Sequence, residues 1–116
     1  MGVRVLMFQE RFVAGIRSGE KRQTIRKKAR CKPGDVLSLR RWTGRPYRSK
    51  QEEIRRAVCT GVSIVGIVGP APGAKVRLSV PLDEFARRDG FRDWADMRAW
   101  FEREHGLPFV GRLIRW

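Results

Sequence analysis

The fold is decided by VRVLMFQERFVAGIRSGEKRQTIRKK, which is residues 3–28 of the chain. Val3, Val5 and Met7 alternate with Arg4 and Leu6, which predicts a first strand that ends near Phe8. Three apolar residues then recur at every fourth position, as on one face of a short helix: Phe8, Phe12 and Ile16. Gly19 is placed to end that helix in a left-handed cap, and residues 22–28 favour an extended conformation.

Turn signals and alternating segments continue this pattern through the middle of the chain. Lys32-Pro33-Gly34-Asp35 predicts a turn, because proline presets φ and glycine accepts a positive φ. Alternation predicts a strand over residues 36–42, and the basic, Gly- and Pro-containing residues 43–55 predict an exposed loop or hairpin tip. Residues 56–68 are rich in β-branched residues and predict one long strand. Its alternation is interrupted near Gly61 and Gly66, which predicts a bulge that bends the strand.

The last third of the chain predicts two helices between strands. A turn falls at residues 69–73 and a strand at residues 75–80. Pro81 begins a helix, because proline fits a first turn, and Asp93 is placed as the N-cap of a second helix. The inward faces of these helices are Leu82, Phe85 and Ala86, then Trp94, Met97, Trp100 and Phe101 before Gly106. Residues 109–116 close the chain as a strand.

These elements predict a mixed α/β fold that is mainly β. About six short strands and two or three short helices, without a strand-helix-strand rhythm, favour a small β-barrel decorated by helices over a doubly wound sheet. The chain has 116 residues, of which 41% are hydrophobic. That length suits one domain over residues 1–116, with a core that needs neither a disulfide nor a metal.

Charge gives the first indication of function. The formal net charge is +14, and residues 1–56 hold 17 basic and 5 acidic side chains against 9 and 7 in residues 57–116. Like charges at that density destabilise a fold unless a polyanion neutralises them, and nucleic acid is the polyanion expected. The alternative is a solvated, Arg-rich surface without a partner. We expect contacts to RNA from Arg22, Arg26, Lys27, Lys28, Arg40, Arg41, Trp42, Arg45, Tyr47 and Arg48.

Two aromatic residues lie within the second basic block. Trp42 and Tyr47, interleaved with arginines, have the composition of a base-stacking platform, in which each stacked base contributes ~1–3 kcal/mol. The alternative for Trp42 is a place in the core.

Several classes of protein are disfavoured. Cys31 and Cys59 are the only cysteines and His105 is the only histidine, so no zinc site of four ligands is expected, and we expect no cofactor. We expect both thiols to be reduced, and a disulfide between them is the alternative. The longest apolar stretch, residues 62–68, is too short to cross a bilayer, and no signal peptide is recognised, so we expect a cytoplasmic monomer without a membrane partner.

The first third of the chain also resembles a known family. The segment Phe8-Gln9-Glu10-Arg11-Phe12 is followed by Ile16, Gly19, Lys21, Thr24, Ile25, Arg26, Pro33-Gly34-Asp35 and Val36. This pattern resembles the ASCH domain family, in which a short helix leads into a GxKxxTIR motif and then a GD turn. Asp89-Gly90-Phe91, Trp100-Phe101 and residues 111–116 are similar to the family as well. The resemblance implies a PUA-like β-barrel with a cleft, and a role near RNA or modified nucleosides.

The resemblance implies two activities. Some members bind RNA, and ribonuclease activity has been attributed to some of them. Others remove the acetyl group of N4-acetylcytidine, which implies Lys21 and Thr24 as two catalytic residues and Asp89 at the place of the family's glutamate. Aspartate keeps the charge but is one methylene shorter.

The same residues can be read without the family. A threonine hydroxyl becomes a nucleophile only when a base removes its proton, and a lysine serves as that base when burial or neighbouring cations lower its pKa. Here Arg22 and Arg26 are the neighbouring cations of Lys21. The alternatives are a solvated Lys21, a Thr24 that only fills a strand, an Asp89 that caps a helix or pairs with Arg88 or Arg92, and an Arg26 that pairs with Asp35 or Asp89 instead of a ligand.

Overall fold

The computed structural model describes residues 2–67 and 81–116. Val68, the predicted turn at 69–73 and the predicted strand at 75–80 lie outside these residues. The elements are β1 (Val3–Met7), the 3-10 helix η1 (Glu10–Phe12), α1 (Val13–Ser18), β2 (Gln23–Arg26), β3 (Val36–Trp42), β4 (Gln51–Val58), β5 (Gly61–Ile67), α2 (Leu82–Arg88), α3 (Trp94–Glu104) and β6 (Phe109–Arg115).

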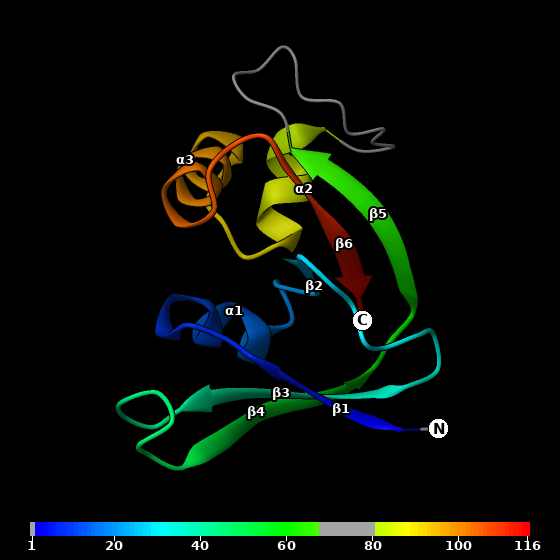
Figure 1. The fold of residues 1–116 in the computed structure, drawn as a ribbon, viewed down its shortest axis with the longest axis vertical. Coiled ribbons are helices and arrows are strands. Elements are labelled where there is room, and N and C mark those ends of the chain that lie inside the picture. The colour runs from blue at the N-terminus through cyan, green and yellow to red at the C-terminus, as the bar shows by residue number, and fades with distance from the viewer. Residues whose placement is uncertain (1, 68–80) are drawn as a thin grey trace.

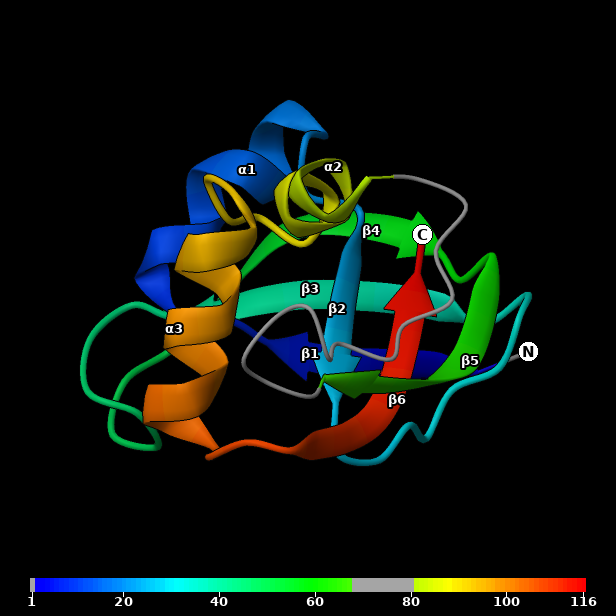
Figure 2. The same ribbon diagram turned by 90° about the horizontal axis from the view of Figure 1, so that it is seen from above.

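The described strands form two three-stranded sheets (Figure 1). In the first sheet β3 lies between β1, which is parallel to it, and β4, which is antiparallel. In the second sheet β6 lies between β2 and β5 and is antiparallel to both. The strands of the two sheets run nearly crosswise in Figure 2. The mixed α/β class is thus confirmed, whereas within residues 2–67 and 81–116 no ladder joins the two sheets into a barrel.

The connection between the sheets corrects two predictions. The predicted loop over residues 43–55 is too long, because β4 begins at Gln51. The predicted single strand over residues 56–68 is two strands, because the chain leaves β4 at Val58 and enters the other sheet at Gly61. A Cβ on Gly61 would lie 2.5 Å from Arg115 Nη2, so the close approach of β5 to β6 there requires glycine.

The helix boundaries follow their sequence signals. Gly19 ends α1 with φ of 84°, α2 follows Pro81, and the Asp93 carboxylate accepts the Asp96 N–H at 2.8 Å. One expectation fails, since Phe8 precedes η1 instead of lying on a helix, although it is buried. Figures 1 and 2 show the three α-helices gathered on one side of the sheets.

Buried apolar residues from both sheets and all three α-helices form a single cluster. The end of β1, strand β2 and the end of α2 meet beside this cluster, which places the polar residues described below against apolar packing. Within the described part of the chain, no helix has the length and apolar character needed to cross a membrane.

Candidate functional site

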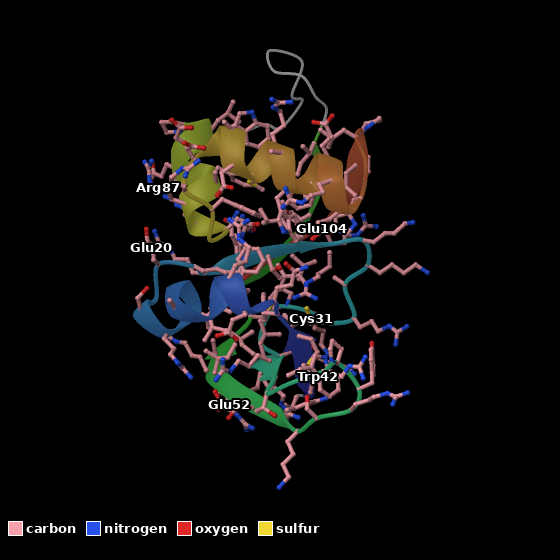
Figure 3. All side chains as sticks on the ribbon, turned by 90° about the vertical axis from the view of Figure 1, so that its left-hand side faces the viewer. Glu20, Cys31, Trp42, Glu52, Arg87 and Glu104 are labelled. Atoms are coloured by element: carbon pink, nitrogen blue, oxygen red, sulfur yellow. The ribbon has the colours of Figure 1, made fainter. Side chains whose placement is uncertain are left out.

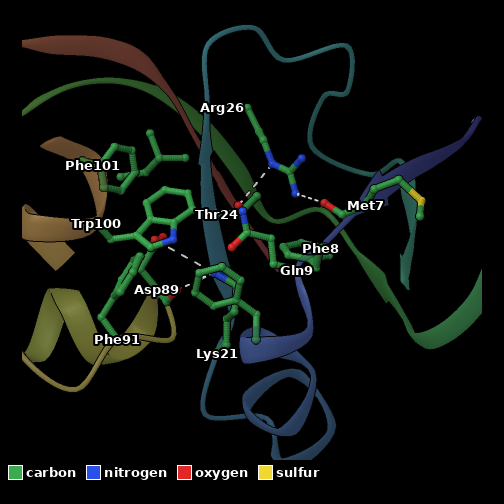
Figure 4. Close-up of a pocket in the computed structure, with 12 residues that line it drawn as sticks. Met7, Phe8, Gln9, Lys21, Thr24, Arg26, Asp89, Phe91, Trp100 and Phe101 are labelled. Carbon is green, nitrogen blue, oxygen red and sulfur yellow. Dashed lines mark hydrogen bonds and ion pairs between the residues drawn. The ribbon is translucent and has the colours of Figure 1, made fainter. Parts of the chain in front are cut away.

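A cavity of about 140 Å³ lies where these ends meet (Figure 4). Four predicted site residues line it together: Lys21, Thr24, Arg26 and Asp89. The other walls are mainly apolar and aromatic, from Met7, Phe8, Phe12, Ile25, Phe91, Trp100 and Phe101, with Gln9 beside them. A cavity of about 150 Å³ in another protein holds one benzene molecule. The Lys21 cavity, as we call it, therefore has the size of a single aromatic ring.

Backbone hydrogen bonds bring Lys21 and Asp89 together from distant parts of the sequence. Lys21 N–H donates to Gly15 O at 3.0 Å, and Arg22 N–H donates to Arg88 O at 2.9 Å, which ties the start of β2 to the end of α2. Asp89 follows as the C-cap of α2. Gly90 has φ of 90°, and a Cβ there would lie 2.8 Å from Lys21 Cδ, so glycine at this position leaves room for the lysine side chain.

Lys21 is the most unusual residue of the cavity, because it is a buried cation with only 2% of its surface exposed. Its Nζ donates to Gln23 O at 2.9 Å and to Asp89 O, and it lies 3.9 Å from Asp89 Oδ2. The Phe12 ring centroid is 4.6 Å from Nζ. Burial lowers the pKa of Lys21 to about 8, even though Asp89 opposes this shift. The solvated alternative for Lys21 is therefore wrong.

Asp89 is buried to a similar degree, at 3% exposed. Burial raises its pKa to about 6, against the opposing effect of Lys21. Gln23, which the sequence did not single out, orients the carboxylate by donating from Nε2 to Oδ1 at 3.4 Å. Of the two alternatives for Asp89, the helix cap is confirmed, since Asp89 is the C-cap of α2. The pairing with Arg88 or Arg92 does not occur. Arg88 Nη2 lies 2.9 Å from Glu84 Oε1, and Arg92 Nε lies 3.7 Å from Asp93 Oδ2.

Thr24 and Arg26 form the opposite part of the site. Arg26 Nε donates to Thr24 Oγ1 at 3.3 Å, and Nη2 donates to Met7 O at 2.7 Å, as the dashed lines of Figure 4 show. The Phe8 ring centroid lies 4.7 Å from the guanidinium carbon. Burial lowers the pKa of Arg26, and Asp89 opposes that shift. Among residues 2–67 and 81–116, Arg26 takes part in no ion pair, so the alternative of a structural bridge to Asp35 or Asp89 is wrong.

The Thr24 hydroxyl accepts from Arg26 and still has its own proton to donate. Within the described residues it makes no direct hydrogen bond to Lys21, although both side chains line one cavity. An ammonium or amine, a hydroxyl, a guanidinium and a carboxyl thus surround a ring-sized space. Such a set can bind a ring that carries both hydrogen-bond donors and acceptors.

The residues expected to contact RNA fall into two groups. The exposed ones are Arg22, Lys27, Lys28, Arg45, Tyr47 and Arg48, and the half-buried ones are Arg26, Arg40, Arg41 and Trp42. Arg41 is held within the protein, since it contacts Glu10 Oε2 at 2.6 Å and Glu52 Oε1 at 3.1 Å. Arg40 is likewise held, because its Nε donates to Ser38 Oγ at 2.8 Å. These two arginines are therefore less available to a ligand than the exposed group.

Trp42 and Tyr47 lie together at the tip of the β3–β4 hairpin. Their ring centroids are 5.0 Å apart, and the rings are tilted by 47°. Tyr47 is 88% exposed, and Trp42 is half-buried rather than part of the buried core. The pair keeps the exposed ring surface that base stacking needs.

Sequence reasoning missed the aromatic walls of the cavity. Phe12, Phe91 and Trp100 have the spacing of core residues, and they do pack together. The Phe12 ring is T-shaped to both other rings, with Phe12 and Phe91 centroids 5.3 Å apart. Trp100 is half-buried, so one part of its ring packs while another lines the cavity. Nothing in the sequence separates these two uses of an aromatic residue.

Both cysteines are free, and within the described part of the chain no cluster of His, Cys, Asp and Glu is arranged to hold a metal ion. Comparison with protein-family models, with curated proteins and with solved structures finds no match to this chain.

Proposed function

We propose that this protein is an RNA-binding domain of the ASCH type, with the PUA-like architecture that this resemblance implies, and that the Lys21 cavity receives one base of the bound strand. The observation that carries the proposal is the meeting of four polar side chains and several aromatic rings around a ring-sized space. The net charge of +14 supports an anionic partner.

The polar groups match the edge of cytosine better than that of uracil. Lys21 and Arg26 supply donors for O2 and N3, which are acceptors on cytosine. The Asp89 carboxylate supplies an acceptor for the exocyclic N4 amino group. Uracil presents an oxygen at that position, which an ionised carboxylate repels. We therefore expect a preference for cytosine.

The experiment compares binding of single-stranded oligocytidylate and oligouridylate of equal length by fluorescence anisotropy. The protein should bind oligocytidylate about tenfold more tightly, because one good pair of edge contacts discriminates by ~1–3 kcal/mol. Asp89→Asn should abolish most of this preference, since its amide can donate to the uracil oxygen. Arg103→Gln, an exposed residue near the end of α3, is the control and should leave the preference intact. Equal binding of both oligomers by the unaltered protein would contradict base recognition in the cavity.

A second function is favoured by the buried lysine. A neutral Lys21 amine has two N–H groups, and the carbonyl oxygens of Gln23 and Asp89 accept two hydrogens from Nζ. Its lone pair is then free to accept the Thr24 proton. The Thr24 oxygen would bond to the acetyl carbon of N4-acetylcytidine, the bond from that carbon to N4 would break, and Lys21 would return the proton to N4. Water would then hydrolyse the acetyl ester to acetate.

This hydrolase function predicts a pH profile. Only the neutral amine is a base, so kcat/KM for free N4-acetylcytidine should rise about tenfold per pH unit below the pKa of Lys21, about 8, and level off above it. Chromatographic separation of cytidine from its acetylated form measures the rate. Lys21→Met and Thr24→Val should each abolish turnover. A rate that stays flat between pH 6 and 9, or that survives Thr24→Val, would exclude this mechanism.

Ribonuclease activity, the other activity that the resemblance implies, would appear as shortened oligomers in the samples of the binding experiment.

A further inference from the structure

A second cavity lies beside the Lys21 cavity, where β1, an outer strand of its sheet, faces the connection from β2 to β3. Its volume is about 340 Å³. The residues that line it are Val3, Arg4, Val5, Leu6, Arg26, Lys28, Arg30, Cys31 and Ile114. Figure 3 labels Cys31 on this connection, from which nitrogen-tipped side chains extend into solvent. We call this cavity the edge groove.

The edge groove is strongly cationic. Four of its nine lining residues are basic, and none is acidic. Lys28 and Arg30 are exposed and form no ion pair within residues 2–67 and 81–116. Arg4 is only loosely paired, with Nε 3.9 Å from Asp35 Oδ2. A phosphate would find several unsatisfied donors here, where the field of the protein already attracts an anion.

Apolar side chains form the remaining walls. Val3 and Val5 are 52% and 45% exposed, although most large apolar side chains among residues 2–67 and 81–116 are buried. An exposed apolar surface next to cations suits a ligand with both characters, such as the sugar and phosphate of a nucleotide. A small inorganic anion would leave these valines in water.

Arg26 joins the edge groove to the Lys21 cavity, because it lines both. Two of its five N–H groups donate to Thr24 Oγ1 and Met7 O, so three remain for a ligand. A planar guanidinium with free donors is well suited to hold a phosphate at one side and a base at the other. The two cavities therefore share a wall that can contact two adjoining parts of one ligand.

We propose that the edge groove binds the phosphodiester next to the nucleotide whose base occupies the Lys21 cavity. This inference rests on the function proposed above and extends it, because it names a nucleotide within a strand, and not a free nucleoside, as the ligand of the site. The alternative occupant of a cationic groove at a strand edge is an acidic peptide that pairs along β1.

The test uses two isoleucines as separate reporters. Ile25 lines the Lys21 cavity and Ile114 lines the edge groove. Methyl resonances of the ¹³C-labelled 116-residue chain are followed by NMR during titration with cytidine, cytidine 5′-monophosphate, cytidine 3′-monophosphate, tetracytidylate, inorganic phosphate and hexaglutamate. We expect cytidine to shift Ile25 alone, and tetracytidylate together with one of the two monophosphates to shift both reporters. That monophosphate should bind about tenfold more tightly than cytidine.

A charge-matched pair of variants locates the effect. Lys28→Gln/Arg30→Gln should remove the affinity gained from the phosphate and leave cytidine binding unchanged. Arg87→Gln/Arg103→Gln, which removes two exposed cations outside the groove, should preserve that gain. Two results would overturn this inference alone. In the first, cytidine shifts Ile25, but neither the monophosphates nor tetracytidylate bind more tightly than cytidine. In the second, hexaglutamate or inorganic phosphate shifts Ile114 as much as tetracytidylate does. Failure of every nucleic-acid ligand to shift Ile25 would overturn the proposed function itself.

Discussion

Replacing Lys21 by methionine should lower the free energy of unfolding by ~3–5 kcal/mol, because it leaves the buried Asp89 carboxylate without its cationic partner. Asp89→Asn should also destabilise the fold, since it leaves a buried ammonium unpaired. The double variant Lys21→Met/Asp89→Asn should lose much less free energy of unfolding than the two single variants lose in sum. Urea unfolding of the four proteins measures this coupling.

The matched control is Arg98→Met. Arg98 pairs with Glu102 at 3.7 Å on the surface of α3, and such pairs contribute ~0–1 kcal/mol. Two results would contradict a coupled buried pair. One is that Lys21→Met lowers the free energy of unfolding no more than Arg98→Met does. The other is that the losses from Lys21→Met and Asp89→Asn add fully in the double variant.

The Lys21→Met protein should also show a specific pH dependence. Asp89 already has a pKa raised to about 6, and the loss of Lys21 removes an effect that lowers it. A carboxyl with a raised pKa binds its proton more tightly in the folded state than in the unfolded state, so stability increases as pH falls through that pKa. The difference in free energy of unfolding between the unaltered protein and Lys21→Met, measured by urea unfolding, should therefore be smaller at pH 5 than at pH 8.

The affinity for single-stranded RNA should fall about 300-fold between 50 and 200 mM monovalent salt. The slope of log K against log salt is ~0.7 per phosphate for single strands, and roughly six contacts give a slope near −4. The exposed cations that carry this expectation have no ion pair within residues 2–67 and 81–116: Arg22, Lys27, Lys28, Arg30, Arg45 and Arg48.

Fluorescence anisotropy at several salt concentrations measures this slope. Lys27→Gln/Lys28→Gln should make it shallower by about 1.4, because two counterion-releasing contacts are lost. Arg41→Gln should change it little, since Glu10 and Glu52 already neutralise that guanidinium. A slope near zero for the unaltered protein would mean that its basic surface does not bind the RNA backbone.

The elements of this fold could be predicted where local chemistry decides them. The Gly19 cap, the turn at Gly34 and the Asp93 N-cap each depend on one residue and its neighbours, and all three are formed. The division between β4 and β5 could not be predicted, because it depends on which sheet each half pairs with. Alternation along a strand does not distinguish one long strand from two strands in different sheets.

The candidate site was predictable in part for the same reason. Lys21, Thr24 and Arg26 lie close in sequence, and the resemblance singled out Asp89, so these four could be grouped before the structure. Gln23 and the aromatic walls could not, because their contribution depends on packing between α3, η1 and β2. Likewise, the sequence does not predict that Arg4 and Arg30 line the same groove, because they come from separate segments that only the fold places together.

The central claim is that the Lys21 cavity takes a nucleobase. A crystal structure of the protein with tetracytidylate tests it most directly. We expect one cytosine ring in the cavity, with N4 within ~3.2 Å of an Asp89 carboxylate oxygen and the ring against Phe8 or Trp100. A complex in which the RNA lies only across exposed cations, with no base between Lys21 and Thr24, would contradict the claim.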